Sequence, residues 1–311
     1  MGRPWTSAAT FGPSAPCSTK CLGSLPQRIE LDLRVVDQHE RRRDLRVVEE
    51  RLHFRRNKLG ALPLLGDAVP PVLINLGASQ NDRGRYAEAE ALYRQALAIL
   101  KAFYGDDPFR TASGMTMLGR ALVYQKRFDE GVVLLERALT VQERVNGPMH
   151  PRVASALNDL GSAALQQKRL DDAESRFRRM IEVYQKVYGD SHYLPGIALS
   201  NLASVLTEKK QYADAERLYR EAIAIYERTL SPTHLNTGIG RIKLGRVLLR
   251  QTRYGEAEKQ VLAGYAILKA QASPAVSWLK SAREDLIAIY DALGQPRKAE
   301  PFRAEPGSGS K

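Results

Sequence analysis

The sequence of 311 residues has only two cysteines and no long apolar run. Cys17 and Cys21 lie in a segment rich in proline and serine, without a second pair or neighbouring histidines, so they make a poor metal site. No apolar stretch approaches the roughly 18 residues needed to span a bilayer, and the amino terminus has no apolar core of a secretory signal. We therefore expect a protein of the reducing cytoplasm that holds no metal and no cofactor.

Sequence patterns that accompany catalysis are also missing. The chain has no glycine-rich phosphate loop, no Gly-x-Ser-x-Gly elbow, no His-Glu-x-x-His pair and no kinase signature set. Paired acids such as Asp171 and Asp172 stand where a helix is expected to begin, and negative charge is favourable at the amino end of a helix dipole. We expect that the chain is not an enzyme.

Charge of one sign is not concentrated along most of the chain. The formal net charge is +12, but 47 basic residues are interleaved with 35 acidic ones, as on the solvated faces of helices. Nucleic-acid binding is therefore not expected in general. A lesser possibility concerns residues 28–58, where Arg41–Arg43 and Arg55–Arg56 could bind nucleic acid or an anionic membrane; that binding would weaken steeply with salt.

What the sequence does contain is a repeat. A leucine followed by a small residue, at Leu76 and Gly77, returns every 42 residues through Leu244 and Gly245, and Leu286 with Ile287 closes the series at the same interval. The leucines are Leu76, Leu118, Leu160, Leu202, Leu244 and Leu286, and a second, always small position is Ala89, Gly131, Ala173, Ala215, Ala257 and Ala299. Such a period indicates stacked supersecondary units that are stabilised by contacts between neighbours.

Each unit is expected to hold two amphipathic helices joined by a short turn. In the third unit, apolar residues at helical spacing predict one helix over 151–167 and a second over 171–187. Gly189 can end the second helix in a left-handed conformation, and Pro151 can begin the first. The small residue allows the helices to approach closely, because a larger side chain at the crossing would force them apart. The fold class that follows is all-α: a right-handed α-solenoid of about five helix-turn-helix repeats plus a C-terminal capping helix.

The chain divides accordingly. Residues 1–27 are expected to be a disordered leader, 28–69 a basic segment of undecided structure, 70–303 the solenoid and 304–311 a flexible tail. Pro296 and Pro301 are expected to interrupt the second helix of the last unit. The repeats are expected at about 70–108, 109–150, 151–193, 194–235, 236–275 and, in part, 276–303.

These positions resemble a known family. A Leu-Gly pair, an aromatic position ten residues later, a small residue three positions beyond it and a second amphipathic helix resemble the tetratricopeptide repeat (TPR). The 42-residue period looks like the longer variant found in kinesin light chain. The resemblance covers roughly residues 70–303 and implies a scaffold for protein–protein interaction, although such folds serve unrelated partners.

In that family the first helices of the repeats line a concave groove that binds a peptide or a helical segment. Carried over by position relative to the repeated leucine, the resemblance implies a groove of polar and basic residues, whose arginines could bind carboxylates or phosphate. An ordinary solvated helix face remains the other interpretation. The implied groove residues are Thr116, Arg120, Tyr124, Asn158, Ser162, Gln166, Ser200, Asn201, Ser204, Lys243, Arg246 and Arg250.

Three histidines occupy one position of the repeat, at His150, His192 and His234. Zinc needs nitrogen ligands at about 2.0–2.1 Å, whereas stacked helices lie about 8–10 Å apart. The histidines are therefore expected to cap the helices that follow them rather than to bind a metal.

The leading hypothesis is a non-catalytic adaptor that binds an unidentified protein or peptide in the groove. The alternative is the regulatory or sensor portion of a bacterial-type signalling system that acts with a serine/threonine kinase or an NTPase. The sequence does not indicate the partner, the peptide motif or the oligomeric state.

Overall fold

The structure is a computed structural model that describes residues 62–105, 107–271 and 275–304. The expectations for the leader, for residues 28–61 with their arginine runs, and for the tail beyond Ala304 lie outside these residues.

The described residues form α-helices and one short 3-10 turn, and they contain no strand. The helices make six consecutive pairs, and we call the first helix of each pair A and the second B. The A helices are α2 (Leu62–Asp82), α4 (Pro108–Tyr124), α6 (Pro151–Gln166), α8 (Leu194–Glu208), α10 (Leu235–Arg250) and α12 (Val276–Ala292). The B helices are α3 (Tyr86–Tyr104), α5 (Phe128–Asn146), α7 (Leu170–Tyr188), α9 (Tyr212–Thr229), α11 (Tyr254–Lys269) and α13 (Pro296–Ala304).

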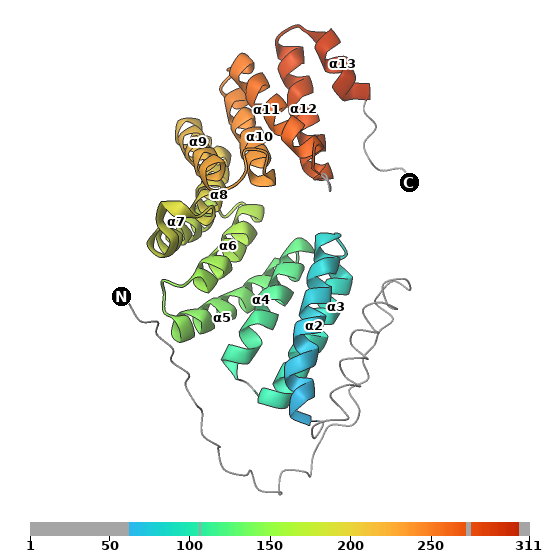
Figure 1. The fold of residues 1–311 in the computed structure, drawn as a ribbon, viewed down its shortest axis with the longest axis vertical. Helices are drawn as coiled ribbons and strands as arrows, with labels where there is room; N and C mark the ends of the chain where they lie inside the picture. Colours follow the sequence, from blue (N-terminus) through green and yellow to red (C-terminus); the bar gives the residue numbers. More distant parts are fainter. Residues whose placement is uncertain (1–61, 106, 272–274, 305–311) are drawn as a thin grey trace, which may run out of the picture.

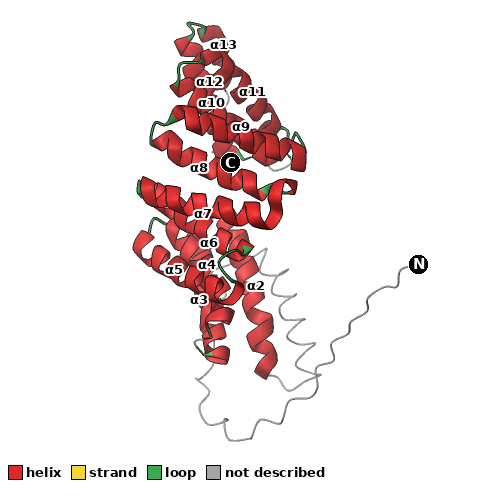
Figure 2. Cartoon of the chain, turned by 90° about the vertical axis from the view of Figure 1, so that its left-hand side faces the viewer, coloured by secondary structure: helices red, strands yellow, loops and turns green. Residues whose placement is uncertain are grey.

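The pairs stack into a curved array, the all-α solenoid expected from the sequence (Figure 1). Along the middle of the array, α6 and α8 lie on the inner side of the curve, and α7 and α9 lie on the outer side (Figure 1). Figure 2 shows the stack from its outer side. Neighbouring A helices contact each other at α2–α4, α4–α6, α8–α10 and α10–α12, whereas neighbouring B helices make weaker contact or none. This difference is what curvature requires, because the inner layer of a bent stack is the more crowded one.

The repeated small residues lie where the A and B helices cross. A Cβ atom added to Gly131 on α5 would lie 2.9 Å from the Gly119 carbonyl oxygen on α4, and one added to Gly119 would lie 3.0 Å from the Gly131 carbonyl oxygen. Both distances are shorter than a carbon atom tolerates, so the helices touch through their backbones. The predicted reason for the small residues is confirmed at this crossing.

The ends of the helices follow the expected chemistry. Gly147 and Gly189 have φ of 80° and 53°, which is the left-handed region that glycine adopts at low cost. The histidines cap the following helices: the backbone N–H of Arg152 donates to His150 Nδ1 at 3.2 Å, and that of Asn236 donates to His234 Nδ1 at 3.1 Å. The equivalent bond at His192 also spans 3.2 Å. Capping is therefore confirmed for His150 and His234, whereas His192 makes its bond from the position before Tyr193, the N-cap residue of α8.

The two ends of the array differ from the sequence expectation. α2 begins at Leu62, upstream of the expected start at Pro70, and Pro70 and Pro71 lie inside it. At the other end, Pro296 does not interrupt a helix but begins one, α13, which continues through Pro301. The expectation of an interruption was wrong. Proline at the first helical position loses no hydrogen bond, which accounts for Pro296, while Pro301 is accommodated inside the helix. In the described part of the chain, no helix is both long and apolar enough to cross a membrane.

Candidate binding surface on the inner helices

Every predicted groove residue lies on an A helix, on α4, α6, α8 or α10. We call the side of these helices that carries them the inner face. Residues at the corresponding positions of successive repeats come together there, because neighbouring A helices are in contact. Many of their polar groups bond to groups of a neighbouring repeat.

Two predicted arginines are held by aspartates of the next A helix. Arg120 on α4 donates from Nε and Nη2 to the two carboxylate oxygens of Asp159 on α6, at 3.1 and 2.8 Å. Arg246 on α10 makes the same two-pronged contact with Asp285 on α12, with a shortest distance of 2.7 Å, and it also donates to the Ser281 hydroxyl. These arginines connect repeats, so they are not available to a ligand in the way the sequence suggested.

Burial dominates the electrostatics of these pairs. It raises the pKa of the Asp159 carboxyl, and the charge and hydrogen bonds of Arg120 oppose that rise. Burial likewise raises the pKa of Asp285, against the hydrogen bonds and charge of Arg246. A carboxylate that is withdrawn from water depends on its cation, so removing either arginine would leave a buried charge unpaired.

Neutral side chains link the central repeats. The Asn201 side-chain amide on α8 donates to the side-chain Oδ1 of Asn158 on α6 at 2.7 Å. The Ser204 hydroxyl lies 2.9 Å from the Tyr219 hydroxyl of α9. Thr116 donates to its own helix, to the Ala112 carbonyl oxygen at 3.0 Å. The amide and hydroxyl groups expected to contact a peptide backbone are therefore partly engaged with one another.

Lys243 on α10 has a different environment from the arginines. Its Nζ contacts the hydroxyls of Ser204 at 3.2 Å and Ser200 at 3.5 Å, and it lies 5.7 Å from the centre of the Trp278 ring. Burial, with a smaller contribution from the Arg246 charge, lowers the pKa of Lys243 to about 8. It remains a cation at neutral pH.

Three predicted residues are exposed, and a fourth, Ser162, is partly exposed and makes no internal hydrogen bond. Tyr124 is 45% exposed and stacks on the Tyr86 ring, with 5.1 Å between the ring centres. Gln166 and Arg250 are exposed and Ser162 is partly exposed. Within the described part of the chain these three side chains make no hydrogen bond or ion pair, although the Arg250 charge acts on Asp285 from a distance and lowers its pKa.

Sequence reasoning missed three residues of this surface: Asp159, Asp285 and Trp278. A signal for the aspartates was present, because each stands one residue before a repeated leucine and 39 residues after its arginine. The predicted groove takes the position before the leucine only at Asn201 and Lys243. Trp278 carried no such signal, since its place depends on how α12 packs beside α10.

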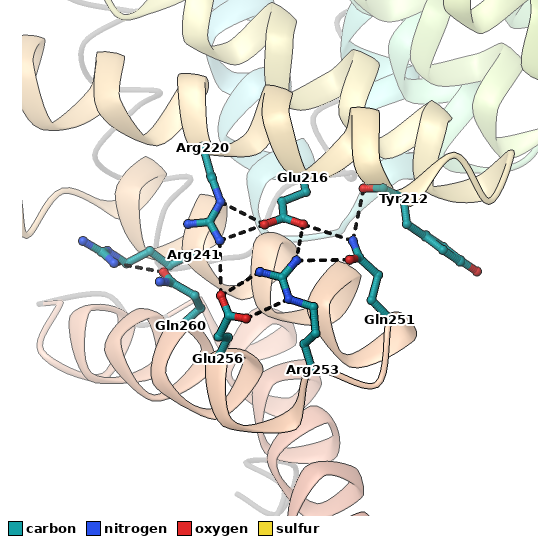
Figure 3. Close-up of polar contacts among 8 residues, drawn as sticks. All are labelled: Tyr212, Glu216, Arg220, Arg241, Gln251, Arg253, Glu256 and Gln260. Atoms are coloured by element: carbon teal, nitrogen blue, oxygen red, sulfur yellow. Dashed lines mark hydrogen bonds and ion pairs between the residues drawn. The ribbon is translucent and has the colours of Figure 1, made fainter.

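A second polar system joins neighbouring repeats at the turns between A and B helices (Figure 3). Glu216 on α9 accepts from Arg220, Gln251 and Arg253, and Arg253 also donates to Glu256 on α11. We call this group the turn clamp. The same clamp joins the first two repeats, where Glu90, Arg94, Gln125, Arg127 and Glu130 occupy the corresponding positions. Its recurrence shows that it serves the stacking of repeats. In the described residues no group of three or more potential metal ligands is found.

Comparison with known proteins identifies the repeat. A family model described as tetratricopeptide repeat matches residues 69–130, 110–186 and 194–270. The solved structure of BtubC (BKLC) from P. vanneervenii is similar over 77% of this chain and 96% of that one, with 21% identity and a TM-score of 0.61. Kinesin light chain TPR-like repeats from Podospora anserina are similar over 67% of this chain and 100% of that one, with 21% identity and a TM-score of 0.54.

A third similar structure is that of NprR in complex with its cognate peptide NprX. The similarity extends over 85% of this chain and 72% of that one, with 13% identity and a TM-score of 0.59. At these identities the likeness concerns the fold alone. No curated protein matches the sequence. Because the family model matches more than half of the chain, and because paired helices recur in register along it, this chain belongs to the tetratricopeptide repeat family, with repeats of the longer, kinesin-light-chain-like type.

Proposed function

We propose that the chain is a non-catalytic cytoplasmic scaffold whose inner face binds an extended peptide or a helical segment of a partner protein. The observation that carries this proposal is the accessible row of Ser162, Gln166 and Arg250, on A helices whose other polar groups already connect the repeats. The bonds between repeats fix the A helices relative to one another, so the backbone positions of the accessible side chains are set before a ligand binds, which favours recognition. The NprR structure contains a peptide, and that supports the same use of a similar fold here.

This proposal removes Arg120 and Arg246 from the residues that the sequence predicts to contact the ligand. Their guanidinium groups hold Asp159 and Asp285, so a ligand could reach them only by displacing a buried carboxylate. Contact with backbone groups of a peptide is therefore assigned to the serine and amide side chains, and contact with an anionic group to Arg250 and Lys243.

Selection from a randomised peptide display library tests the proposal. The inner variant combines Ser162→Lys, Gln166→Ala and Arg250→Glu, none of which removes an internal hydrogen bond. The matched outer variant makes nearly the same changes on exposed residues of α7, with Ser175→Lys, Gln185→Ala and Lys186→Glu. Circular dichroism establishes first that both variants are as helical as the parent chain.

We expect peptides selected on the parent chain to bind the outer variant equally and the inner variant at least about tenfold more weakly, a loss of about 1.4 kcal/mol. Equal binding to the inner variant would contradict the proposal and move the interaction to another surface. The same pair of variants serves in affinity capture from cells. Recovery of a kinase or an NTPase, lost only with the inner variant, would favour the alternative function in a signalling system.

A further inference from the structure

Two lysines of the described residues are partly buried, and their surroundings differ in charge. Lys209, which follows α8, donates to the carboxylates of Asp171 at 2.5 Å and of Glu174 at 2.6 Å. Lys243 on α10 has no carboxylate among the described residues as a partner. The other described lysines are exposed. Among the described residues, Lys243 is therefore the one lysine that is withdrawn from water without a counter-ion.

The nitrogen of Lys243 is surrounded by groups that do not neutralise its charge. Its Nζ contacts the Ser204 hydroxyl at 3.2 Å and the Ser200 hydroxyl at 3.5 Å, both from α8. The Trp278 ring of α12 has its centre 5.7 Å away. The charge that acts on this nitrogen is that of Arg246, which has the same sign. Three neighbouring A helices thus hold an amine in surroundings that favour its neutral form.

These surroundings make Lys243 a nucleophile at neutral pH. Burial, and to a smaller extent the Arg246 charge, lower the pKa of Lys243 to about 8. At pH 7.4 about 20% of the chains then carry a neutral amine here, against about 0.1% for a lysine of ordinary pKa. Only the neutral amine can attack a carbonyl carbon, and desolvation beside another cation activates a lysine in this manner. Hydrogen bonds to Asp171 and Glu174 instead raise the pKa of Lys209, so that amine stays protonated.

The site suits a small anionic reagent. Lys243 and Trp278 both keep partial exposure to solvent, although other atoms crowd the lysine nitrogen. Arg250, seven residues further along α10, lies on the same side of the helix and is exposed. Within the described part of the chain it makes no ion pair, so its charge attracts an anion towards Lys243. An acyl phosphate is a small acyl donor with negative charge next to its reactive carbon.

We propose that Lys243 is an acylation site, whose amine takes a small acyl group such as acetyl from an acyl phosphate. The amine attacks the acyl carbon, and an amide N–C bond forms. The C–O bond to the phosphate breaks with its electron pair on the oxygen, and the proton lost by the nitrogen ends on the released phosphate. The amide is uncharged, so acylation removes a buried charge that water no longer hydrates.

Acylation of Lys243 also removes a cation from the inner face. This consequence rests on the proposed function, which assigns Lys243 to contact with an anionic group of the partner. The modification therefore weakens binding of the partner, whereas the reactivity of the amine depends only on its surroundings within the chain.

Acetyl phosphate tests the inference on the whole folded chain. The chain is incubated with it at pH 7.4, and mass spectrometry of proteolytic peptides gives the rate of acetylation at each lysine. Lys259, exposed on α11, is the reference. Lys209 is the matched control, because it is also partly buried but is paired with carboxylates.

We expect Lys243 to react at least about tenfold faster than Lys259, because its larger neutral fraction outweighs the lower nucleophilicity of a less basic amine. Lys209 should react more slowly than Lys259. A rate at Lys243 that is equal to or below the rate at Lys259 overturns the inference. So does a rate at Lys209 that matches the rate at Lys243, because burial alone would then explain the reactivity.

The pH profile gives a second readout. The rate at Lys243 should rise to pH about 8 and level off above it. The charged and titratable groups that face the site are Arg246 on α10, Tyr219 and Tyr226 on α9, and Asp285 on α12. Burial raises the pKa of both tyrosines, so neither ionises near pH 8. A rate that keeps rising to pH about 10 overturns the inference.

Peptides selected on the parent chain separate this inference from the proposed function. Chain acetylated at Lys243 should bind them at least about tenfold more weakly than untreated chain. The same treatment should not change binding to Lys243→Arg, which keeps the charge in a guanidinium group that stays protonated. Equal weakening of both chains, or of neither, overturns the effect of acylation on binding. Selection that yields no binding peptide overturns the proposed function, whereas the acetylation rates test the site by themselves.

Discussion

One residue in each turn between the A and B helices has a left-handed backbone. Gly84 and Gly294 hold this position in the first and last repeats, but Lys126, Lys168, Lys210 and Thr252 hold it in the others, with φ from 59° to 63°. This conformation costs residues with a Cβ atom about 1 kcal/mol, and β-branched residues are the least suited to it. The turn is therefore imposed by the stacking of the helices rather than by the residue.

Replacement of Thr252 by glycine should accordingly stabilise the chain. We expect Thr252→Gly to raise the free energy of unfolding by about 1 kcal/mol, as measured by urea denaturation. The same substitution at Thr140, an exposed residue inside α5, should lower it, because glycine weakens a helix interior. A decrease for Thr252→Gly would contradict the strain assigned to this turn.

The titration of Lys243 makes a second prediction at the level of one residue. Its pKa is about 8 in the folded chain against an ordinary value of 10.5, so the unfolded chain binds more protons between these two values. The charged and titratable groups facing this site are Arg246 on the same helix, Tyr219 of α9 behind Ser204, and Asp285 of α12.

Stability should therefore rise with pH across that window, because stability rises wherever the unfolded state binds more protons. The loss of stability caused by the buried charge of Lys243 is fully present below pH about 8 and disappears above about 10.5. We expect Lys243→Met to be more stable than the parent chain at neutral pH and the difference to shrink as pH rises to about 10.5. A difference that does not change with pH, in urea denaturation, would show that the lysine is not withdrawn from water.

At the scale of helices, the crossing of A with B is set by the small position. Ala215 on α9 is fully buried, and Ala203 on α8 holds the place that Gly119 has in the second repeat. We expect Ala215→Leu to overpack this crossing and to lower the free energy of unfolding by about 1–3 kcal/mol. Ala213→Leu, at an exposed position of the same helix turn, is the control. An unchanged denaturation midpoint for Ala215→Leu would refute the pairing of α8 with α9.

The contact between neighbouring A helices depends on buried ion pairs. Asp159 is 6% exposed, so Arg120→Met should leave an unpaired buried carboxylate and cost about 3 kcal/mol of stability. Replacing both partners, as Arg120→Met with Asp159→Leu, should restore most of that stability, since an apolar pair of similar volume often substitutes for a buried ion pair. A double-mutant cycle measured by denaturation tests the coupling, and additive effects would argue against it.

At the scale of the whole molecule, the turn clamp is not uniform. In the second repeat, Val132 on α5 occupies the position that Glu90 holds in the first repeat and Glu216 in the fourth. The side-chain N–H₂ of Gln167, which corresponds to Gln125 and Gln251, is buried there without a partner. The joint between repeats two and three therefore lacks a connection that the first and fourth joints have.

Introducing the missing carboxylate should repair that joint. We expect Val132→Glu to stabilise the chain by about 1 kcal/mol, because hydrogen bonds to a charged group contribute about 1.5–3 kcal/mol and offset the loss of a partly buried valine. Val133→Glu, one residue further on and 51% exposed, should change little. Thermal denaturation checks both variants, and destabilisation by Val132→Glu would show that the clamp does not extend to this joint.

The sequence by itself determined the repeat, the helix pairs and the small crossing positions. These features depend on spacing along one helix and on chemistry within one unit, so the periodic leucines and Gly119 with Gly131 disclose them directly. The capping histidines belong to the same class, since each acts on a backbone N–H two residues away. The sequence wrongly predicted an interruption in α13. Proline favours the start of a helix but disrupts its interior, and the sequence alone did not show that Pro296 stands at the start.

Only the tertiary structure decided which cations of the inner face are paired with a carboxylate of another repeat. Arg120 and Asp159 are 39 residues apart, and their contact depends on the rise and twist from one repeat to the next. Lys243 stands one residue before a repeated leucine, as Asp159 and Asp285 do, yet no carboxylate among the described residues lies in contact with it. A repeated sequence position specifies the helix face on which a side chain lies. The charge opposite that side chain comes from another repeat. That charge decides whether the side chain bonds to the next repeat or stays available to a ligand.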